Sequence, residues 1–203
     1  MSIEINPHLE DVNSSMHRWA KMNPNQLALA DSTQSFTWQA LDKTLNQVAN
    51  TLIKSGITPN QRIAILGSNS VEYALLFLGG LRAGICITPL STLASSEALV
   101  GMINDSEAKL LFISQDYWNL IDSVTDKLTH LLPDGLKVLD GECLDFNHTD
   151  RQNFASFIES ASTDSADIPL SLDWGFNLIY SSGTTGLPKG ILQSRRYRAL
   201  EAQ

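Results

Sequence analysis

The chain has 203 residues, a formal net charge of −8, 43% hydrophobic residues and 18% charged residues. This balance is typical of a globular protein and excludes a disordered chain, and the length suits one large domain or two small ones. Because the net charge is negative, the chain has no general attraction for nucleic acid or anionic membranes, and any phosphate-binding site must be built locally.

Helix-like and strand-like segments alternate along the sequence. Apolar residues at helical spacing predict helices over 9–19, 41–53, 68–81, 96–104, 117–131 and 152–160, and a further helix from Arg195 onward. Short apolar runs predict strands over 27–31, 34–37, 62–66, 85–88, 109–114, 136–139, 174–180 and 191–193. This alternation predicts an α/β fold in which helices flank a layered, largely parallel sheet. A polar linker over 162–166 indicates a subdomain break near 161–170 within a single segment that spans 1–203.

The cysteines and histidines form no metal or disulfide pattern. Cys86 lies in a predicted buried strand, where we expect a core role, and Cys143 with His148 offers only two candidate metal ligands. Gly79, Gly80 and Gly84 are expected to permit close packing of a helix on a strand. No apolar run is long enough for a transmembrane helix, and the N-terminus lacks the pattern of a signal peptide, so we expect a cytoplasmic protein.

The segment 180–190 carries the clearest chemical pattern, with the sequence Tyr-Ser-Ser-Gly-Thr-Thr-Gly-Leu-Pro-Lys-Gly. Its glycines let backbone amides approach an anion closely, and its hydroxyls can donate to phosphate oxygens or ligate magnesium. Lys189 supplies the positive charge that a triphosphate needs. The segment is not a Walker A loop, because Leu187 and Pro188 separate Gly186 from Lys189. Its composition also fits an ordinary surface loop, but the order of its residues favours a phosphate site.

This segment resembles the phosphate-loop signature of the adenylate-forming enzymes, a superfamily that includes the acyl-CoA synthetases. Two further segments agree and lie in the order that the family requires, since 36–41 resembles its first core motif and 80–90 its second. Asn104-Asp105-Ser106 also lies where the family would place it. The resemblance runs from about residue 11 to the C-terminus and implies the N-terminal part of the large domain of an acyl-CoA synthetase-like fold.

The resemblance implies a two-step reaction on a small carboxylic acid, with ATP, Mg²⁺ and coenzyme A. The carboxylate attacks the α-phosphate of ATP, and a thiol then displaces AMP from the acyl-adenylate. The residues that the resemblance assigns to phosphate binding are Ser181, Ser182, Gly183, Thr184, Thr185, Gly186 and Lys189. The hydroxyls of Thr184 and Thr185 are its candidate ligands for Mg²⁺, and Pro188 is expected to stiffen the loop. The catalytic lysine of the family lies downstream, so no catalytic residue is assigned within this chain.

The sequence departs from the family in two places, and its second motif helps to choose among the branches of the family. It ends soon after Gly190, whereas family members are much longer, so we expect the N-terminal piece of a larger enzyme. Alone, this piece is expected to have little ligase activity. It is also expected to self-associate through surface exposed by truncation. Many relatives place a histidine after Ser194, where this chain has the basic run 195–198, and a solvated helix face is the favoured interpretation over a contact with phosphate or coenzyme A. The second motif ends in Pro89-Leu90-Ser91, which favours fatty-acyl or aryl-acid CoA ligases over amino-acid-activating domains.

The sequence therefore leaves alternatives open. The first hypothesis is an ATP-dependent carboxylic acid–CoA ligase. The second is a short non-catalytic module that binds a nucleotide or an acyl ligand. A fragment of an amino-acid-activating adenylation domain is a further alternative. The intact phosphate-loop pattern favours an enzyme.

Overall fold

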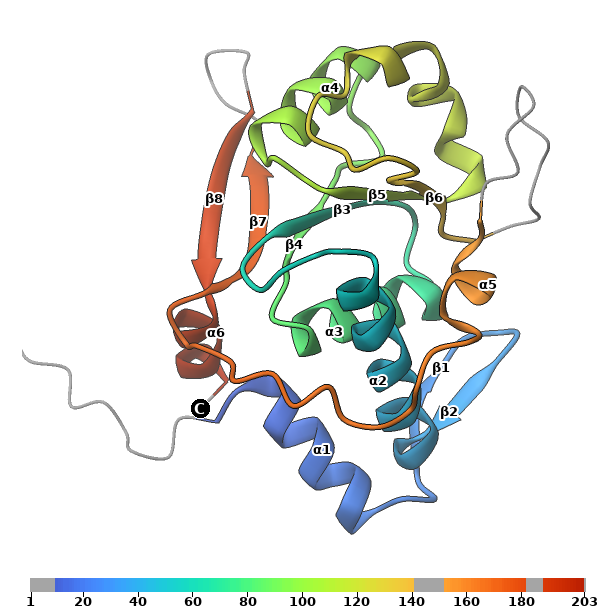
Figure 1. Ribbon diagram of the computed structural model, residues 1–203, viewed down its shortest axis with the longest axis vertical. Helices are drawn as coiled ribbons and strands as arrows, with labels where there is room; N and C mark the ends of the chain where they lie inside the picture. Colours follow the sequence, from blue (N-terminus) through green and yellow to red (C-terminus); the bar gives the residue numbers. More distant parts are fainter. Residues whose placement is uncertain (1–9, 141–151, 182–187, 203) are drawn as a thin grey trace, which may run out of the picture.

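The structure, a computed structural model, describes residues 10–140, 152–181 and 188–202 (Figure 1). Six strands form the main sheet in the order β6-β5-β3-β4-β7-β8, and β1 and β2 form a small antiparallel sheet. In the main sheet only β7 and β8 pair in antiparallel fashion, and the other pairs are parallel. The predicted α/β fold with a largely parallel sheet is therefore confirmed.

The bounds of the elements follow the predicted order along the chain. The strands are β1 (Leu27–Ala30), β2 (Ser35–Thr37), β3 (Arg62–Leu66), β4 (Cys86–Pro89), β5 (Leu110–Ile113), β6 (Leu136–Val138), β7 (Gly175–Ser181) and β8 (Lys189–Ser194). The α-helices are α1 (Val12–Met22), α2 (Trp38–Lys54), α3 (Val71–Arg82), α4 (Ser96–Asp105), α5 (Phe154–Ile158) and α6 (Arg195–Glu201). Two 3₁₀-helices follow β5, namely η1 (Gln115–Leu120) and η2 (Asp122–Lys127).

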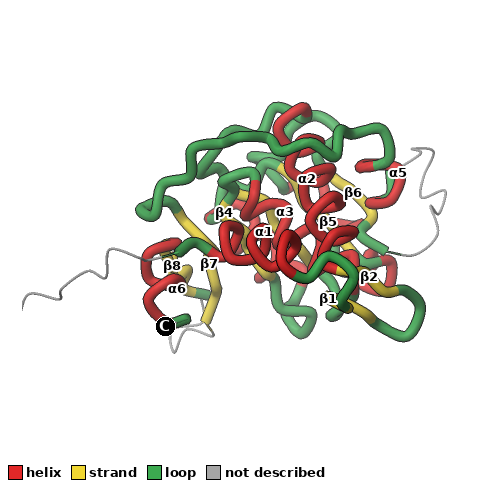
Figure 2. The backbone as a smooth tube through the Cα atoms, turned by 90° about the horizontal axis from the view of Figure 1, so that it is seen from below, coloured by secondary structure: helices red, strands yellow, loops and turns green. Residues whose placement is uncertain are grey.

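Helices cover both faces of the central strands. On β3, Ile63 and Ile65 pack in the core cluster with α1, α2 and α3, whereas Ala64 and Leu66 pack in a second cluster with α4 and η1. Figure 1 shows α4 and the helices α2 and α3 on opposite sides of the sheet, and Figure 2 shows α1, α2 and α3 gathered on one side of the strands. Strands buried on both faces are typical of parallel sheets, which explains their uninterrupted apolar sequences.

Hydroxyl side chains define the starts of several helices. The side chains of Thr37, Ser70 and Ser95 accept hydrogen bonds from backbone N–H groups in the first turns of α2, α3 and α4. Each bond satisfies a donor that the helix itself leaves unpaired. These caps place the ends of the helices close to where the sequence pattern predicts them.

The segment predicted as a helix over 117–131 is different in the structure. It forms η1 and η2, and the chain becomes extended at Leu128. The buried residues Trp118, Ile121 and Val124 recur every third residue, which matches the period of a 3₁₀-helix and not that of an α-helix. The prediction of a continuous helix was therefore wrong because the apolar spacing was assigned the wrong period.

The expected close packing of a helix on a strand is observed at Gly80, but not at Gly79 or at Gly84, whose nearest neighbours are Trp174, Leu170 and Pro59. A Cβ at Gly80 would lie 2.6 Å from Cδ1 of Ile87 on β4, so with a side chain there either Ile87 or α3 would have to shift. At Gly79 the neighbour is Val48 of α2, which makes this a contact between helices. Cys86 is buried as predicted, and burial raises the pKa of its thiol to about 11, which disfavours the reactive thiolate.

The chain between α5 and β7 crosses the molecule as a strap, defined here as residues 161–170. Side-chain amides of α2 hold its main chain, since Asn46 Nδ2 donates to the carbonyl of Thr163 over 2.8 Å and Asn50 Nδ2 donates to the carbonyls of Ser162 and Asp164. The strap thus has many of its polar backbone groups satisfied without belonging to a sheet. The predicted subdomain break in this region stays a prediction.

Candidate functional site

The hairpin of β7 and β8 carries the two described ends of the predicted phosphate segment. Ser181 and Lys189 are register partners at the last rung of the hairpin, and both are exposed. Residues 182–187, which include the predicted Ser182, Gly183, Thr184, Thr185 and Gly186, lie outside the described residues. The structure therefore brings Ser181 and Lys189 together, as a phosphate site requires.

Lys189 keeps its charge available for a ligand. Its ammonium group forms no ion pair with another residue in the described part of the chain, whereas each of the nearby arginines of α6 does. A cation on an exposed rung of an acidic protein provides a local centre for binding phosphate oxygens.

Tyr180 connects this rung to the body of the protein. Its hydroxyl donates a hydrogen bond of 2.6 Å to Oδ2 of Asp105, the last residue of α4. Burial of the ring raises the pKa of Tyr180, and the hydrogen bond and the negative charge of Asp105 raise it further. The proton therefore stays on the tyrosine at neutral pH, so the hydroxyl remains the donor.

The neighbours of Asp105 in the predicted motif also make bonds between elements. Asn104 Nδ2 donates to the carbonyl of Lys127 over 2.8 Å, and the carbonyl of Ser106 accepts from Nη1 of Arg62 over 3.1 Å. The motif 104–106 thus joins α4 to η2, β3 and β7. In this chain the motif forms a junction between these elements beside the hairpin.

The prediction that the basic run 195–198 forms a solvated helix face is wrong for Arg195. Arg196 and Arg198 are partly exposed and pair with Asp173 and Glu201, as a solvated face predicts. Arg195, in contrast, has a side chain that is 0% exposed, and its Nη1 pairs with Oδ2 of Asp11 over 2.9 Å. Its Nη2 donates to the carbonyl of Leu81.

The physical reason for this correction lies far away in sequence. The carboxylate of Asp11 caps α1 through a bond from the N–H of Asn13, and it also meets the buried guanidinium. A buried charge needs such a partner. Because the described carboxylates already neutralise all three arginines, none of the three has an unpaired charge for a phosphate ligand.

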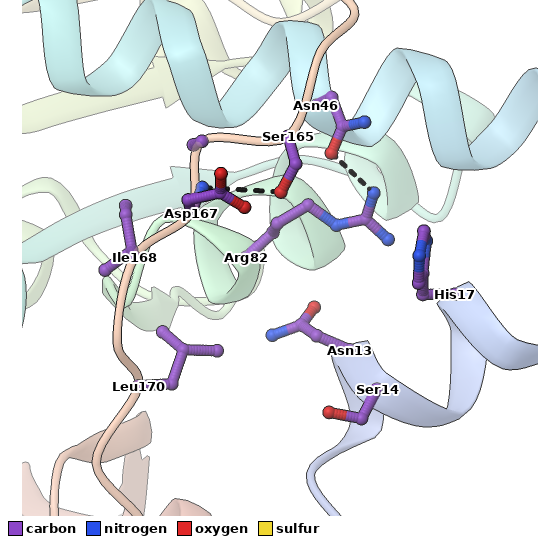
Figure 3. A pocket seen from close by; sticks show the side chains of 10 residues that line it. Asn13, Ser14, His17, Asn46, Arg82, Ser165, Asp167, Ile168 and Leu170 are labelled. Atoms are coloured by element: carbon purple, nitrogen blue, oxygen red, sulfur yellow. Dashed lines mark hydrogen bonds between the residues drawn. The ribbon is translucent and has the colours of Figure 1, made fainter.

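A polar cavity of about 220 Å³ lies between α1, α2, α3 and the strap (Figure 3). Its arginine, Arg82, is already occupied, because Nη2 pairs with Oδ1 of Asp42 and Nη1 donates to Oδ1 of Asn46, each over 2.8 Å. The lining residues are Asn13, Ser14, His17, Asn46, Arg82, Ser165, Ala166, Asp167, Ile168 and Leu170. None of them belongs to the predicted phosphate segment, and the cavity offers no uncompensated cation.

The described residues do not form a protein-built metal centre. No group of three or more His, Cys, Asp or Glu side chains able to hold a metal ion occurs among them. The candidate ligands Thr184 and Thr185, and the pair Cys143 and His148, lie outside the described part of the chain. None of the helices that the structure describes is both long and apolar enough to cross a membrane.

Reasoning from the sequence missed two contacts at this site. Neither the bond from Tyr180 to Asp105 nor the pair of Arg195 with Asp11 has a local signal, because the partners lie 75 and 184 residues apart. A buried arginine can be suspected only from the replacement of the expected histidine directly after β8. The sequence alone gives no indication of its partner.

Solved structures with the same fold include an acid–CoA ligase. An anthranilate CoA ligase, AuaEII, solved in complex with anthranoyl-AMP, superposes with a TM-score of 0.86 at 24% identity and covers 97% of this chain and 37% of its own. The N-terminal domain of FACL13 from Mycobacterium tuberculosis superposes with a TM-score of 0.76 at 22% identity, covering 92% of this chain and 44% of its own. At these identities the comparison establishes the fold.

Curated relatives fall into several classes at similar identity. The fatty acid–[acyl-carrier-protein] ligase ScoC of Streptomyces coeruleorubidus is 26% identical over 94% of this chain, and 4-coumarate–CoA ligase 1 of Petroselinum crispum is 28% identical over 80%. Tyrocidine synthase 3 of Brevibacillus parabrevis is 30% identical over 83%. The chain spans 34%, 28% and 2% of these relatives, respectively.

A family profile described as AMP-binding enzyme matches residues 16–201. The match includes both strands of the hairpin and the segment between them. Since it covers well over half of the chain, the protein belongs to the AMP-binding family of adenylate-forming enzymes.

Proposed function

We propose that this chain forms the phosphate-binding part of an ATP-dependent acid–thiol ligase that acts on a carboxylic acid and coenzyme A. In the first step a carboxylate oxygen bonds to the α-phosphorus of ATP and pyrophosphate leaves. In the second step a thiolate sulfur bonds to the acyl carbon and AMP leaves. The observation that carries the proposal is the rung of Ser181 and Lys189 at the ends of the signature segment, within a chain of this family.

The residues of this chain would bind and orient the leaving group. Lys189 would offset the negative charge that develops on pyrophosphate, and the hydroxyl of Ser181 would donate to a phosphate oxygen. By resemblance, Ser182, Thr184 and Thr185 would add further hydroxyl donors. Catalysis of such a displacement relies mostly on positioning and charge stabilisation, which this set of groups can supply.

As far as the described residues show, Mg²⁺ fits this site as a partner of the nucleotide, and by resemblance the hydroxyls of Thr184 and Thr185 would be its candidate protein ligands. Hydroxyl groups are acceptable ligands for this hard cation, but the described residues add no carboxylate cluster to hold it. The ion would therefore arrive with the triphosphate and neutralise part of its charge, while Ser181 and Lys189 bind phosphate oxygens directly.

A second candidate is an amino-acid-activating domain. Its support is that tyrocidine synthase 3 is about as similar to this chain as 4-coumarate–CoA ligase 1, at 30% and 28% identity. The sequence Pro89-Leu90-Ser91 at the end of β4 favours the CoA ligases instead. Exchange of pyrophosphate into ATP, tested with fatty acids, aryl acids and amino acids in turn, distinguishes the two candidates.

The first test is the affinity of the chain for MgATP, measured by calorimetry. Loss of a charge-assisted bond to phosphate predicts that Lys189→Ala weakens MgATP binding by about 10-fold or more, while AMP, which lacks the β- and γ-phosphates, binds unchanged. Lys189→Arg should retain most of the affinity because the charge is kept. Lys54→Ala, at the exposed end of α2, is the matched control and should leave binding unchanged.

The second test uses the polypeptide that carries this sequence in its source cells. We expect ATP–pyrophosphate exchange that requires a carboxylic acid and is lost in Lys189→Ala and Thr185→Ala. Wild-type exchange in both variants would overturn the site assignment. The non-catalytic module is favoured instead if the intact mass of the cellular protein is no greater than the 22.3 kDa of this chain and no exchange occurs.

A further inference from the structure

The side chain of Tyr180 lies at the junction of three elements. It stands on β7 directly before Ser181, its ring packs with the apolar cluster that includes Leu99 and Met102 of α4, and its hydroxyl reaches Asp105 at the end of that helix. The bond length of 2.6 Å is in the range of hydrogen bonds from a hydroxyl to a carboxylate, which are stronger than neutral ones.

The ring also extends across the hairpin. Tyr180 is the register partner of Gly190 on β8, and a Cβ at Gly190 would lie 3.2 Å from Cε1 of the tyrosine and 3.1 Å from Cδ1 of Leu178. The space that a side chain at position 190 would need is therefore filled from the opposite strand. As a result, one side chain contacts both strands of the hairpin and α4.

The next rung is Ser181 with Lys189, the two described residues of the phosphate signature. Among the described strands β8 lies at the edge of the main sheet, where it pairs with β7 alone. A fixed contact one rung earlier limits how far the last rung can twist, since paired strands twist together.

We infer that Tyr180 is a positioning residue, which holds the rung of Ser181 and Lys189 in the direction of the bound phosphates through its hydrogen bond to Asp105. The inference rests on the proposed function for the identity of the ligand. The geometry on which it rests lies entirely in the described residues.

The test compares Tyr180→Phe, Asp105→Ala and Asp105→Asn in the 203-residue chain, with MgATP affinity measured by calorimetry. Loss of one such bond predicts that Tyr180→Phe and Asp105→Ala each weaken binding by about 10-fold. The combination of both should be no weaker than either alone, because the two groups act as one unit. Asp105→Asn keeps an amide oxygen that can accept, and should stay within about 3-fold of the original chain.

Tyr117→Phe is the matched control. The hydroxyl of Tyr117 bonds to Oγ of Ser68 over the same distance of 2.6 Å, but neither residue belongs to the hairpin. A merely structural role for Tyr180 predicts that both phenylalanine variants lower the melting temperature and neither changes MgATP affinity. That result would overturn the inference.

Hydrogen exchange of the free chain separates the inference from the proposed function. Tyr180→Phe should speed exchange of the amides that bond across the hairpin near Lys189 and Ile191, relative to those near Gln193, and Tyr117→Phe should not. Unchanged exchange in Tyr180→Phe overturns the inference whether or not ATP binds. If the unaltered chain is folded and does not bind MgATP, the proposed function fails, and the exchange result alone decides whether Tyr180 holds this rung.

Discussion

Asp31 illustrates how a single exposed carboxylate can organise a turn. It lies between β1 and β2, where Oδ1 accepts bonds from the N–H and the hydroxyl of Thr33, each over 2.7 Å, and from the N–H of Gln34 over 2.9 Å. Its Oδ2 accepts from the N–H of Val71, which links the turn to the start of α3. These bonds to the ionised form lower the pKa of Asp31 to about 2.

The lowered pKa gives a prediction about acid stability. The folded-state pKa of Asp31 lies below its ordinary value of 3.8, so its contribution is complete at neutral pH and is lost as the pH falls from about 4 to 2. Asp31→Asn should therefore lower the melting temperature at pH 7, and the difference from the original chain should shrink over that interval.

Thermal unfolding followed by circular dichroism at pH 7, 4 and 2.5 measures this difference. Asp126→Asn is the control, since Asp126 is exposed on η2 and its carboxylate accepts no hydrogen bond from the described residues. A difference in melting temperature between Asp31→Asn and the original chain that stays constant across this pH range would contradict the prediction.

Between elements, the buried pair of Arg195 and Asp11 joins the end of the hairpin to the first helix. Asp11→Asn keeps an oxygen to cap α1 but leaves the charge of Arg195 buried without a counter-charge. We expect a loss of about 3 kcal/mol or more in the free energy of unfolding, which urea unfolding measures.

Asp173→Asn is the control. It removes the partner of the partly exposed Arg196 and should lower the free energy of unfolding by less than about 1 kcal/mol. Equal losses in the two variants would show that burial of the pair contributes nothing.

The elements themselves differ in how far the sequence determines them. Local patterns were sufficient for α3 and α4, because Ser70 and Ser95 mark their starts and apolar residues recur along one face. Local patterns misled for η1, where a period of three resembles the period of an α-helix over a short segment. Contacts between distant residues, such as that of Tyr180 with Asp105, follow from the order of strands in the sheet, and the sequence carries no separate signal for that order.

In the candidate site, too, some features follow from the local sequence and others depend on contacts between distant residues. The order of residues in 180–190 predicts a phosphate site, and the site stays a prediction. That Ser181 and Lys189 face each other depends on the antiparallel pairing of β7 and β8. The sequence predicted both strands but not their direction, because a short apolar run does not distinguish parallel from antiparallel neighbours.

At the scale of the whole molecule, the edge strand β8 bears on the predicted self-association. Within the described residues β8 pairs only with β7, and Ile191 and Leu192 are 51% and 55% exposed. An exposed apolar edge strand favours pairing with another chain. We expect the 203-residue chain to increase in mass with concentration in sedimentation experiments, and Leu192→Lys to reduce that increase. A monomer mass at every concentration would contradict the expectation.

The strap described above also bears on when the proposed phosphate site can form. The strand order β6-β5-β3-β4-β7-β8 means that the chain adds β4 on one side of β3 and then β5 and β6 on the other side, and then crosses back to β4 to add β7 and β8. On a ribosome, the strands from β3 to β6 are all made before the strap and the hairpin emerge. Ser181 and Lys189 therefore belong to the last two strands that are made among those the structure describes. Under the proposed function, nucleotide binding reports that this hairpin has been added to the sheet, because only molecules that have added β7 and β8 present both groups to a ligand.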